Sequence, residues 1–276
     1  MTNPFLPYVG TLAAVRDLAA GIKLYRVRLE DEAGRAAFAA YKPGQFAFLS
    51  AFGVGEVPFG LAGTPARGAE LEFAVAKVGT VTAALHNLEE GAPVGVRGPM
   101  GNSFPVDDFR GRSLVIIGAG IGLAPLRPVI QHALDHRADY GRITLLVAAR
   151  APNLLCFRDE YEQWAAAPDT EFHLTVDAAD ADWTGNVGLV TELQARVSPD
   201  PRNAVAITCG PPIAIKFITQ LLQKQSFAPE QIYTTLEMKM KCGLGKCGRC
   251  NIGERYVCVD GPVFSHAQIL ELIDSF

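Results

Sequence analysis

The chain has 276 residues, of which 49% are hydrophobic and 20% are charged, with a formal net charge of −4 and a pI near 5.8. This length fits two domains of ordinary size, or two with a short appendage. The charge balance leaves no basic surplus that could neutralise a phosphate backbone, so nucleic acid is not an expected partner.

Neither export nor a membrane span is expected. The first seven residues contain no basic stretch followed by an apolar run, which a secretory signal requires. The most apolar stretch, residues 113–130, is interrupted by glycines, prolines and Arg127, and it falls short of the ~20 apolar residues that cross a membrane. We therefore expect a cytoplasmic protein.

Short alternating strands dominate the first part of the chain. They are expected at residues 23–29, 45–49 and 71–76, between glycine and proline residues that favour turns. Short strands in series predict a small all-β antiparallel barrel over residues 1–108.

A strand-then-helix order follows over residues 109–228. After the first strand and its glycine turn, a helix is expected to run to about His136. The strands are expected at residues 114–117, 143–147, 171–176 and 205–209. Alternating strands and helices predict a parallel α/β domain.

The last segment, residues 229–276, fits neither pattern. It gathers glycines and cysteines in a loop, and a short helix is expected after the loop over residues 265–273. We treat this segment as a third element that binds a metal cluster. The absence of a low-complexity linker suggests that the three parts pack closely.

Four of the six cysteines crowd into this last segment. Cys242 and Cys247 are separated by four residues, Cys247 and Cys250 by two, and Cys258 completes the set. This is the spacing of plant-type [2Fe–2S] proteins. A structural zinc site is one alternative, although zinc ribbons usually carry two pairs of cysteines with two-residue spacing. A disulfide is another, and the expected cytoplasmic setting disfavours it.

Glycines alternate with these cysteines. A loop wrapped around iron and sulfide needs backbone conformations with positive φ and amides that point at the sulfurs. Gly243, Gly245 and Gly248 meet that need.

A glycine turn at residues 118–122 separates the first α/β strand from its helix. Backbone amides and the helix dipole at such a turn can bind a pyrophosphate. The third glycine comes one residue earlier than in the standard dinucleotide fingerprint, so a purely structural turn is the alternative. Cys209 follows a later strand and is expected at the carboxyl edge of the sheet, where ligands bind, although lone cysteines more often only pack in a core.

Together these features resemble the ferredoxin–NADP reductase superfamily, in which a flavin-binding barrel precedes an NAD(P)-binding Rossmann-like α/β domain. Residues 79–85 are similar to the flavin-pyrophosphate turn, residues 98–104 to the signature that closes the barrel, and residues 209–211 to the motif beside the nicotinamide ring. The resemblance covers essentially the whole chain and implies FAD and NAD(P)H as cofactors beside the [2Fe–2S] cluster.

The resemblance also implies site residues. Cys209 is expected to line the hydride-transfer site as the catalytic residue, and the four clustered cysteines, Cys242, Cys247, Cys250 and Cys258, are the expected metal ligands. The other cofactor-binding residues are expected to be Pro58, Phe59, Gly60, Leu61, Val75, Lys77, Gly79, Thr80, Val81, Thr82, Gly118, Ala119, Gly120, Ile121, Gly122, Arg150, Asp177, Gly210 and Pro211.

The chain departs from the family pattern on its flavin strand, residues 57–64. The wider family commonly has an arginine on this strand, and Gly60 stands where a serine or threonine is common. No hydroxyl is then available at this position for the N5 edge of the flavin. Backbone groups of the strand, with Thr80 and Thr82, are expected to hold the flavin instead, with weaker binding or a shifted reduction potential.

Within the superfamily, the cysteine cluster followed by residues 260–264 is similar to subunits that serve another catalytic subunit. These are the γ subunits of cytoplasmic NiFe hydrogenases (sulfhydrogenases), the B subunit of anaerobic sulfite reductase and the electron-transfer subunit of dihydroorotate dehydrogenase. The seven residues between Cys250 and Cys258 favour the first two groups over the third, and of these we favour the hydrogenase group. The expected partners are its large, small and iron–sulfur subunits.

The predicted function is therefore that of a diaphorase subunit, which transfers electrons between NAD(P)H and a partner subunit. Hydride carries two electrons and a cluster accepts one, so the flavin is expected to stand between them. Arg150 could meet a ribose 2′-phosphate or merely be solvated, which leaves the choice between NAD and NADP open. A flavin and iron–sulfur redox sensor and a stand-alone reductase are the competing hypotheses.

Overall fold

The computed structural model describes residues 3–274, which form two units. One unit comprises the residues up to Ser103 together with Leu236–Pro262, and the other comprises Phe104–Thr235 and the residues from Val263 onward. The cysteine-rich segment thus packs with the β-rich unit. The predicted domain limits at residues 108 and 228 stay predictions, and residues 1–2 and 275–276 of the predicted domains lie outside the described residues.

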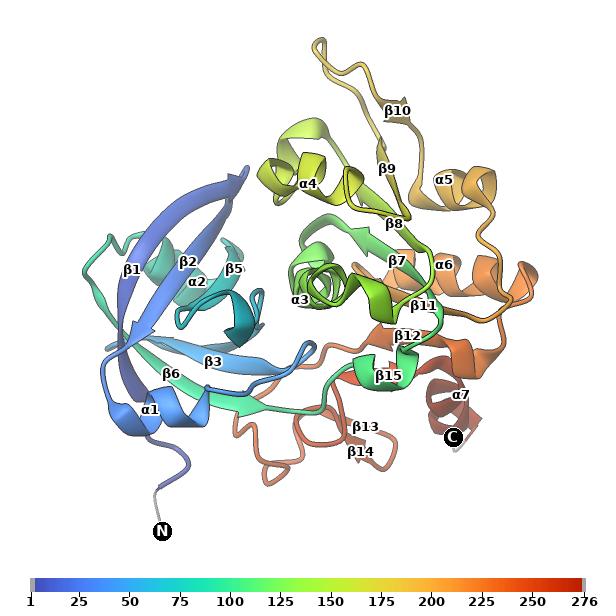
Figure 1. The fold of residues 1–276 in the computed structure, drawn as a ribbon. Helices are drawn as coiled ribbons and strands as arrows, with labels where there is room; N and C mark the ends of the chain where they lie inside the picture. The colour runs from blue at the N-terminus through green and yellow to red at the C-terminus, as the bar shows by residue number, and fades with distance from the viewer. Residues whose placement is uncertain (1–2, 275–276) are drawn as a thin grey trace. The chain divides into compact units, whose positions relative to one another are not determined.

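The first unit is built on a six-stranded antiparallel sheet in the order β4-β3-β6-β1-β2-β5. The end strands β4 and β5 contact each other, so the sheet curls on itself (Figure 1). The predicted all-β antiparallel domain is confirmed. The elements are β1 (Tyr8–Ala19), β2 (Ile22–Leu29), α1 (Glu32–Ala37), β3 (Phe46–Ala51), β4 (Gly55–Gly60), β5 (Leu71–Ala76), α2 (Thr80–His86) and β6 (Pro93–Met100).

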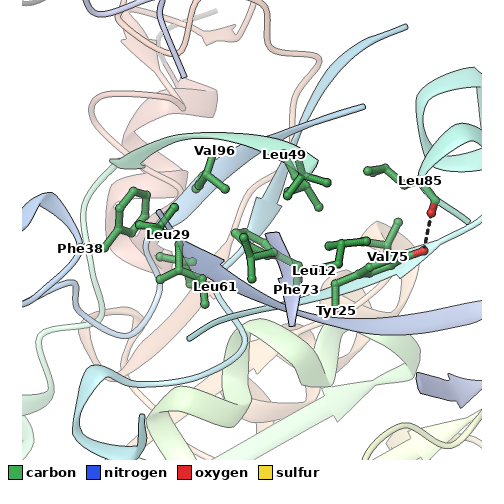
Figure 2. Packing of buried hydrophobic residues seen from close by; sticks show 14 of the residues in the cluster. Leu12, Tyr25, Leu29, Phe38, Leu49, Leu61, Phe73, Val75, Leu85 and Val96 are labelled. Carbon is green, nitrogen blue, oxygen red and sulfur yellow. Dashed lines mark hydrogen bonds between the residues drawn. The ribbon is translucent and has the colours of Figure 1, made fainter. Parts of the chain in front are cut away.

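Alternation along the strands creates the core of this unit. On β2, Tyr25, Val27 and Leu29 are buried while Arg26 and Arg28 are exposed, as the period of a strand requires. Figure 2 shows this core, in which the hydroxyl of Tyr25 donates to the carbonyl oxygen of Leu85 at 3.0 Å. Burial, with a smaller contribution from the charge of Asp17, raises the pKa of Tyr25 to about 12, so the phenol keeps the proton that it donates.

The second unit is an α/β sheet of seven strands in the order β10-β9-β8-β7-β11-β12-β15. All neighbours pair in parallel except β12 and β15, which are antiparallel. Its strands are β7 (Ser113–Ala119), β8 (Ile143–Ala149), β9 (Thr170–Val176), β10 (Asn186–Val187), β11 (Ala204–Cys209), β12 (Ile232–Thr235) and β15 (Val263–Ser265). The predicted parallel α/β domain is confirmed.

Helices cover both faces of this sheet. Figure 1 shows α3 (Leu123–Asp135) and α4 (Tyr161–Ala165) on one face, and α5 (Val190–Val197) and α6 (Pro212–Lys224) on the other. The final helix, α7 (His266–Asp274), confirms the short helix expected at residues 265–273. Among the described helices, none combines the length and apolar character that crossing a bilayer demands.

The remaining elements are short. The cysteine-rich segment carries one two-stranded ribbon, β13 (Asn251–Ile252) with β14 (Arg255–Tyr256). The 3₁₀ turns are η1 (Pro65–Arg67), η2 (Val106–Phe109), η3 (Gly120–Gly122), η4 (Arg137–Asp139), η5 (Pro152–Leu154), η6 (Arg158–Glu160) and η7 (Pro229–Gln231).

Candidate functional site

The carboxyl edge of the parallel sheet contains a topological switch point. From β7 the chain proceeds through β8 to β9 on one side and later returns to β11 on the other side of β7. Open α/β sheets bind ligands outside the strand ends at such a point. Gly118 and Cys209 are register partners on β7 and β11, so the two motifs predicted from the sequence lie side by side there.

The two turns touch through glycine. A Cβ atom at Gly122 would lie 2.5 Å from the Cα atom of Gly210, and a Cβ atom at Gly210 would lie 2.7 Å from the Cβ atom of Ala119. Because the first of these neighbours is backbone, it cannot move aside as a flexible side chain can. Gly120 adds a φ of +59°, which favours glycine. The turn η3 and the start of α3 thus present glycine backbone at the carboxyl edge of the sheet, which suits a pyrophosphate.

Arg150 and Asp177 follow the next two strands of the same edge. Both are exposed, and the amide of Asp177 donates to the carbonyl oxygen of Ala149 while the amide of Ala178 donates to that of Arg150. Partial burial raises the pKa of Asp177, the charge of Arg150 opposes that rise, and Glu192 adds to it. The predicted nucleotide residues therefore lie at the ends of adjacent strands.

Cys209 is almost fully buried at the end of β11. The hydroxyl of Thr235, the last residue of β12, donates to its sulfur at 3.0 Å. The neighbouring Thr208 has a buried hydroxyl without a hydrogen-bond partner among the described residues. Thr235 was not singled out in the sequence, and only its place at the end of a strand could have indicated it.

The predicted flavin strand is β4, at one end of the curled sheet. Pro58, Phe59 and Gly60 are partly exposed, whereas Leu61 is buried in the core and its amide donates to the carbonyl oxygen of Gln45. The structure brings α2 to this strand, since a Cβ atom at Gly55 would lie 3.3 Å from a methyl carbon of Val81.

The threonines of the predicted flavin turn differ in what they contact. The hydroxyl of Thr82 accepts from the amides of Val78 and Gly79 at 2.9 and 2.8 Å, so it shapes the turn itself. Thr80 is exposed at the first position of α2.

Three further residues lie near these flavin segments in the sequence of the β-rich unit. Val75 lies in the barrel core with its carbonyl oxygen bonded to His86, and Lys77 is exposed. Nearby in sequence to β4, Thr64 has a buried hydroxyl with no partner among the described residues. An unpaired polar atom beside this strand fits a site where a bound flavin supplies the missing partner.

The cysteine-rich loop has the backbone that the sequence predicts. Gly243, Gly245 and Gly248 have φ angles of +72°, +68° and +68°. The amides of Leu244 and Lys246 each donate to the sulfur of Cys242 at 3.4 Å, and the amide of Gly245 donates to the sulfur of Cys258 at 3.2 Å. The expected positive φ angles and sulfur-directed amides are confirmed.

The four predicted ligands approach one another in two pairs. Cys247 lowers the pKa of Cys242 and Cys250 raises that of Cys258, so the members of each pair are neighbours. Burial opposes ionisation of Cys242, but three backbone amides and Cys247 outweigh it and lower the pKa of Cys242 to about 6. Burial and the neighbouring Cys250 raise the pKa of Cys258 to about 12.

This donor set fits a two-iron cluster. Among residues 3–274, no three histidine, cysteine, aspartate or glutamate side chains lie close enough together to hold a metal ion, and the four cysteines approach as two pairs instead. A [2Fe–2S] cluster takes four cysteine thiolates, two on each iron, and its sulfurs accept backbone amides. Two cysteine pairs with amides already directed at their sulfurs meet both needs.

The loop also packs on the barrel. Cys250, Val257 and Cys258 share an apolar cluster with Phe46 and Phe48 of β3. A second residue that the sequence analysis missed, Arg97 of β6, donates to the carbonyl oxygen of Cys242 at 2.7 Å. The available signal was a charged residue within an apolar strand, directly before the barrel-closing segment at residues 98–104.

Comparisons with known proteins agree with this geometry. The model of the oxidoreductase NAD-binding domain matches residues 116–220, and the model of the iron–sulfur cluster binding domain of dihydroorotate dehydrogenase B matches residues 237–270. The sulfhydrogenase 1 subunit gamma of Pyrococcus furiosus is 38% identical over 97% of this chain and 94% of its own length. The probable electron-transfer subunit of dihydroorotate dehydrogenase B from Thermococcus kodakarensis is 31% identical over 96% and 99%.

This chain belongs to the family of sulfhydrogenase gamma subunits and dihydroorotate dehydrogenase B electron-transfer subunits. It is an electron-transfer subunit of an oxidoreductase. A second gamma subunit from P. furiosus, that of sulfhydrogenase 2, is 33% identical over 96% of both chains.

Solved structures have the same fold. The NADH-dependent reduced ferredoxin–NADP oxidoreductase, described as an enzyme of flavin-based electron bifurcation, has a chain that matches with a TM-score of 0.76 at 22% identity, over 97% of this chain and 93% of that one. A ferredoxin NADP+ reductase from Neisseria gonorrhoeae, solved with bound FAD and NADP, matches with a TM-score of 0.68 at 18% identity, over 82% and 96%. The resemblance to the ferredoxin–NADP reductase superfamily is confirmed at the level of fold.

The close contact between Gly122 and Gly210 predicts that a side chain at Gly122 weakens nucleotide binding. In Gly122→Ala, the added methyl group overlaps backbone atoms and must push the two turns apart, so we expect the dissociation constant for NADH or NADPH to rise roughly tenfold or more. Titration calorimetry on the purified chain measures this.

Gly111→Ala is the control for that experiment. Gly111 has a φ of +74°, but an added Cβ atom there meets nothing within 4 Å. This variant should lose some stability and bind nucleotide like the wild type. Equal nucleotide affinity in Gly122→Ala and wild type would contradict a binding role for these turns.

Proposed function

We propose that this chain carries electrons between NAD(P)H and a partner catalytic subunit, with FAD and a [2Fe–2S] cluster as its resident groups. The observation that carries the proposal is the occurrence, in one chain, of a glycine turn at the carboxyl edge of a parallel sheet and two cysteine pairs with sulfur-directed amides. A hydride donor transfers two electrons and the cluster accepts one at a time. A group between them must therefore carry out both kinds of transfer, and a bound flavin supplies that chemistry.

The nucleotide contacts come from the α/β unit. Gly118, Gly120, Gly122 and Gly210 leave room for the dinucleotide phosphates, and Cys209, fixed by its bond from Thr235, borders the nicotinamide position. Arg150 and Asp177 face the nucleotide from the ends of β8 and β9.

The flavin contacts come from two segments of the barrel. The backbone of Pro58, Phe59, Gly60 and Leu61 and the turn of Gly79, Thr80, Val81 and Thr82 hold the flavin, with Val75 and Lys77 beside them. Thr80 reaches the ligand directly, while Thr82 keeps the turn in shape. Cys242, Cys247, Cys250 and Cys258 bind the cluster.

The partner we propose is a cytoplasmic NiFe hydrogenase with its large, small and iron–sulfur subunits. Two sulfhydrogenase gamma subunits match this chain over nearly its full length, at 38% and 33% identity. The short gap from Cys250 to Cys258 favours the hydrogenase and sulfite reductase types over the dihydroorotate type. The cluster segment matches the model named after dihydroorotate dehydrogenase B, which supports that enzyme as the second candidate.

The cluster assignment predicts which cysteines matter for metal content. In Cys258→Ser, one iron loses a thiolate, so iron and labile sulfide should fall well below the wild-type content while flavin is retained. Cys156→Ser is the matched control: Cys156 is buried in the α/β unit, and burial raises the pKa of its thiol to about 12. Its metal content should equal that of the wild type.

Elemental analysis, sulfide assay and electron paramagnetic resonance of anaerobically prepared, dithionite-reduced protein check this prediction. Zinc in place of iron, or a full cluster in Cys258→Ser, would contradict the assignment.

The partner is testable by isolation of the tagged chain from its own cells under anaerobic conditions. We expect nickel and hydrogen-dependent reduction of NAD+ or NADP+ to co-purify with it. Co-purification of dihydroorotate-dependent activity without nickel would replace the hydrogenase with the second candidate.

A further inference from the structure

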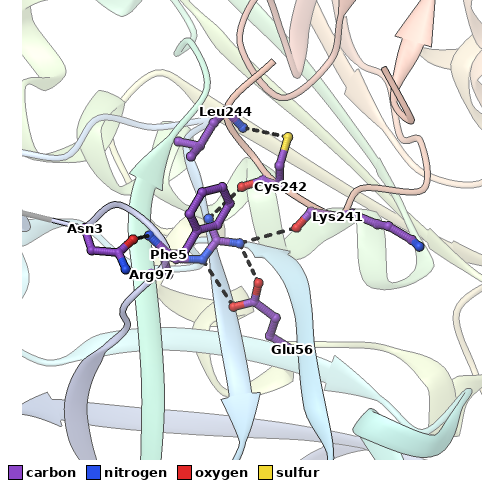
Figure 3. Close-up of polar contacts among 7 residues, drawn as sticks. All are labelled: Asn3, Phe5, Glu56, Arg97, Lys241, Cys242 and Leu244. Carbon is purple, nitrogen blue, oxygen red and sulfur yellow. Dashed lines mark hydrogen bonds and ion pairs between the residues drawn. The ribbon is translucent and has the colours of Figure 1, made fainter. Parts of the chain in front are cut away.

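The barrel strand under the cysteine loop carries a buried arginine. The side chain of Arg97 is only 3% exposed, although arginine is rarely buried without partners. Figure 3 shows its guanidinium between β4 and the first turn of the loop. A buried positive charge requires compensation, so its contacts indicate what it does.

Two of these contacts tie the loop to the barrel. Nη1 of Arg97 donates to the carbonyl oxygen of Cys242 at 2.7 Å, and Nη2 approaches the carbonyl oxygen of Lys241 at 3.5 Å. One acceptor belongs to the first predicted ligand itself and the other to the residue directly before it. The same ligand receives the amides of Leu244 and Lys246 on its sulfur, so Arg97 fixes the peptide from which the cysteine side chain projects.

Aromatic rings hold the guanidinium in place. Its central carbon lies 4.3 Å from the ring centroid of Phe48 and 5.9 Å from that of Phe5. Phe48 also packs with Cys250 and Cys258, and a Cβ atom at Gly243 would lie 2.7 Å from its ring. Arg97, Phe48 and the cluster loop therefore form one packed layer.

The carboxylate of Glu56 compensates the positive charge of Arg97 only in part. Glu56 of β4 accepts from Nε and Nη2 of Arg97 at 3.3 and 2.5 Å, but its side chain is 32% exposed whereas that of Arg97 is 3% exposed. Solvent screens the exposed carboxylate more than the buried guanidinium. The field that reaches the loop from this pair is therefore positive on balance.

We propose that Arg97 is a positioning residue that anchors the Cys242 turn on the barrel and sets the reduction potential of the cluster. Reduction adds one electron and one negative charge to a cluster that is already anionic, so a buried cation nearby favours the reduced form. The inference rests on the proposed function, since it requires that these cysteines hold a [2Fe–2S] cluster.

The test compares three variants by redox titration followed by electron paramagnetic resonance, and by the rate of iron loss to a chelator. Arg97→Met keeps an unbranched stem and removes the charged guanidinium, and we expect a more negative potential and iron loss about tenfold faster than wild type. Glu56→Gln leaves Arg97 in place and removes the balancing charge, and we expect a more positive potential.

Arg97→Lys separates the two roles. It keeps the positive charge but loses the planar fork that reaches Glu56 and the Cys242 carbonyl together. We expect its potential to lie between those of Arg97→Met and wild type, with fast iron loss. Arg26→Met is the matched control, because Arg26 forms a 3.0 Å ion pair with Glu72 on the same barrel but is 52% exposed and, among the described residues, makes no bond to the loop. It should match the wild type in both measurements.

The outcomes distinguish this inference from the proposed function. A wild-type protein without iron and labile sulfide would refute the function itself. A wild-type cluster whose potential is the same in Arg97→Met and Glu56→Gln, or shifts in the same direction in both, would overturn the electrostatic role. Unchanged iron loss in Arg97→Met would overturn the anchoring role.

Discussion

The cluster loop depends on the absence of a side chain at Gly243. A Cβ atom there would lie 2.5 Å from the sulfur of Met100 and 2.7 Å from the ring of Phe48, and the φ angle of +72° disfavours any other residue. Glycine at this position therefore lets the loop pack against β3 and β6, where Arg97 donates to the carbonyl oxygen of Cys242. The direction of the loop amides toward the sulfurs follows from that seating.

The same physical device shapes the nucleotide turn. At Gly122 and Gly210 two backbone segments approach so closely that neither tolerates a methyl group, which leaves peptide amides instead of side chains to face a ligand. At both predicted sites, close backbone contact leaves amide donors available to the anionic groups that we propose to bind there, phosphates at one site and thiolates and sulfide at the other. Side chains then add bonds at the predicted site cysteines, from Thr235 to the sulfur of Cys209 and from Arg97 to the carbonyl oxygen of Cys242.

Much of this could be predicted from the sequence because the signals are local. Alternation from Lys23 to Leu29 predicted β2, and the strand at residues 114–117, with its glycine turn, predicted β7 and the start of α3. Cysteine spacing and the glycines between them predicted the backbone of the loop. These features depend on neighbours within a few residues, which a sequence displays directly.

The remaining features depend on contacts between distant residues. Arg97 and Cys242 are 145 residues apart, and Thr235 reaches Cys209 from another strand, so no local pattern reveals either bond. The hydroxyl of Thr82 closes its own turn. A sequence motif alone does not distinguish this structural role from a contact with a ligand. The packing of Leu236–Pro262 with the β-rich unit likewise arises from Phe46 and Phe48, far away in the chain.

Anaerobic stopped-flow mixing of the purified chain with NADH or NADPH tests the central claim most directly, because the cluster also absorbs at long visible wavelengths where oxidised flavin does not, so the two can be followed separately. If the chain carries electrons from nucleotide to cluster, flavin absorbance falls first and cluster absorbance falls afterwards in the same protein. Absorbance of the cluster that stays constant while the flavin is reduced, or no change with either nucleotide, would contradict the account.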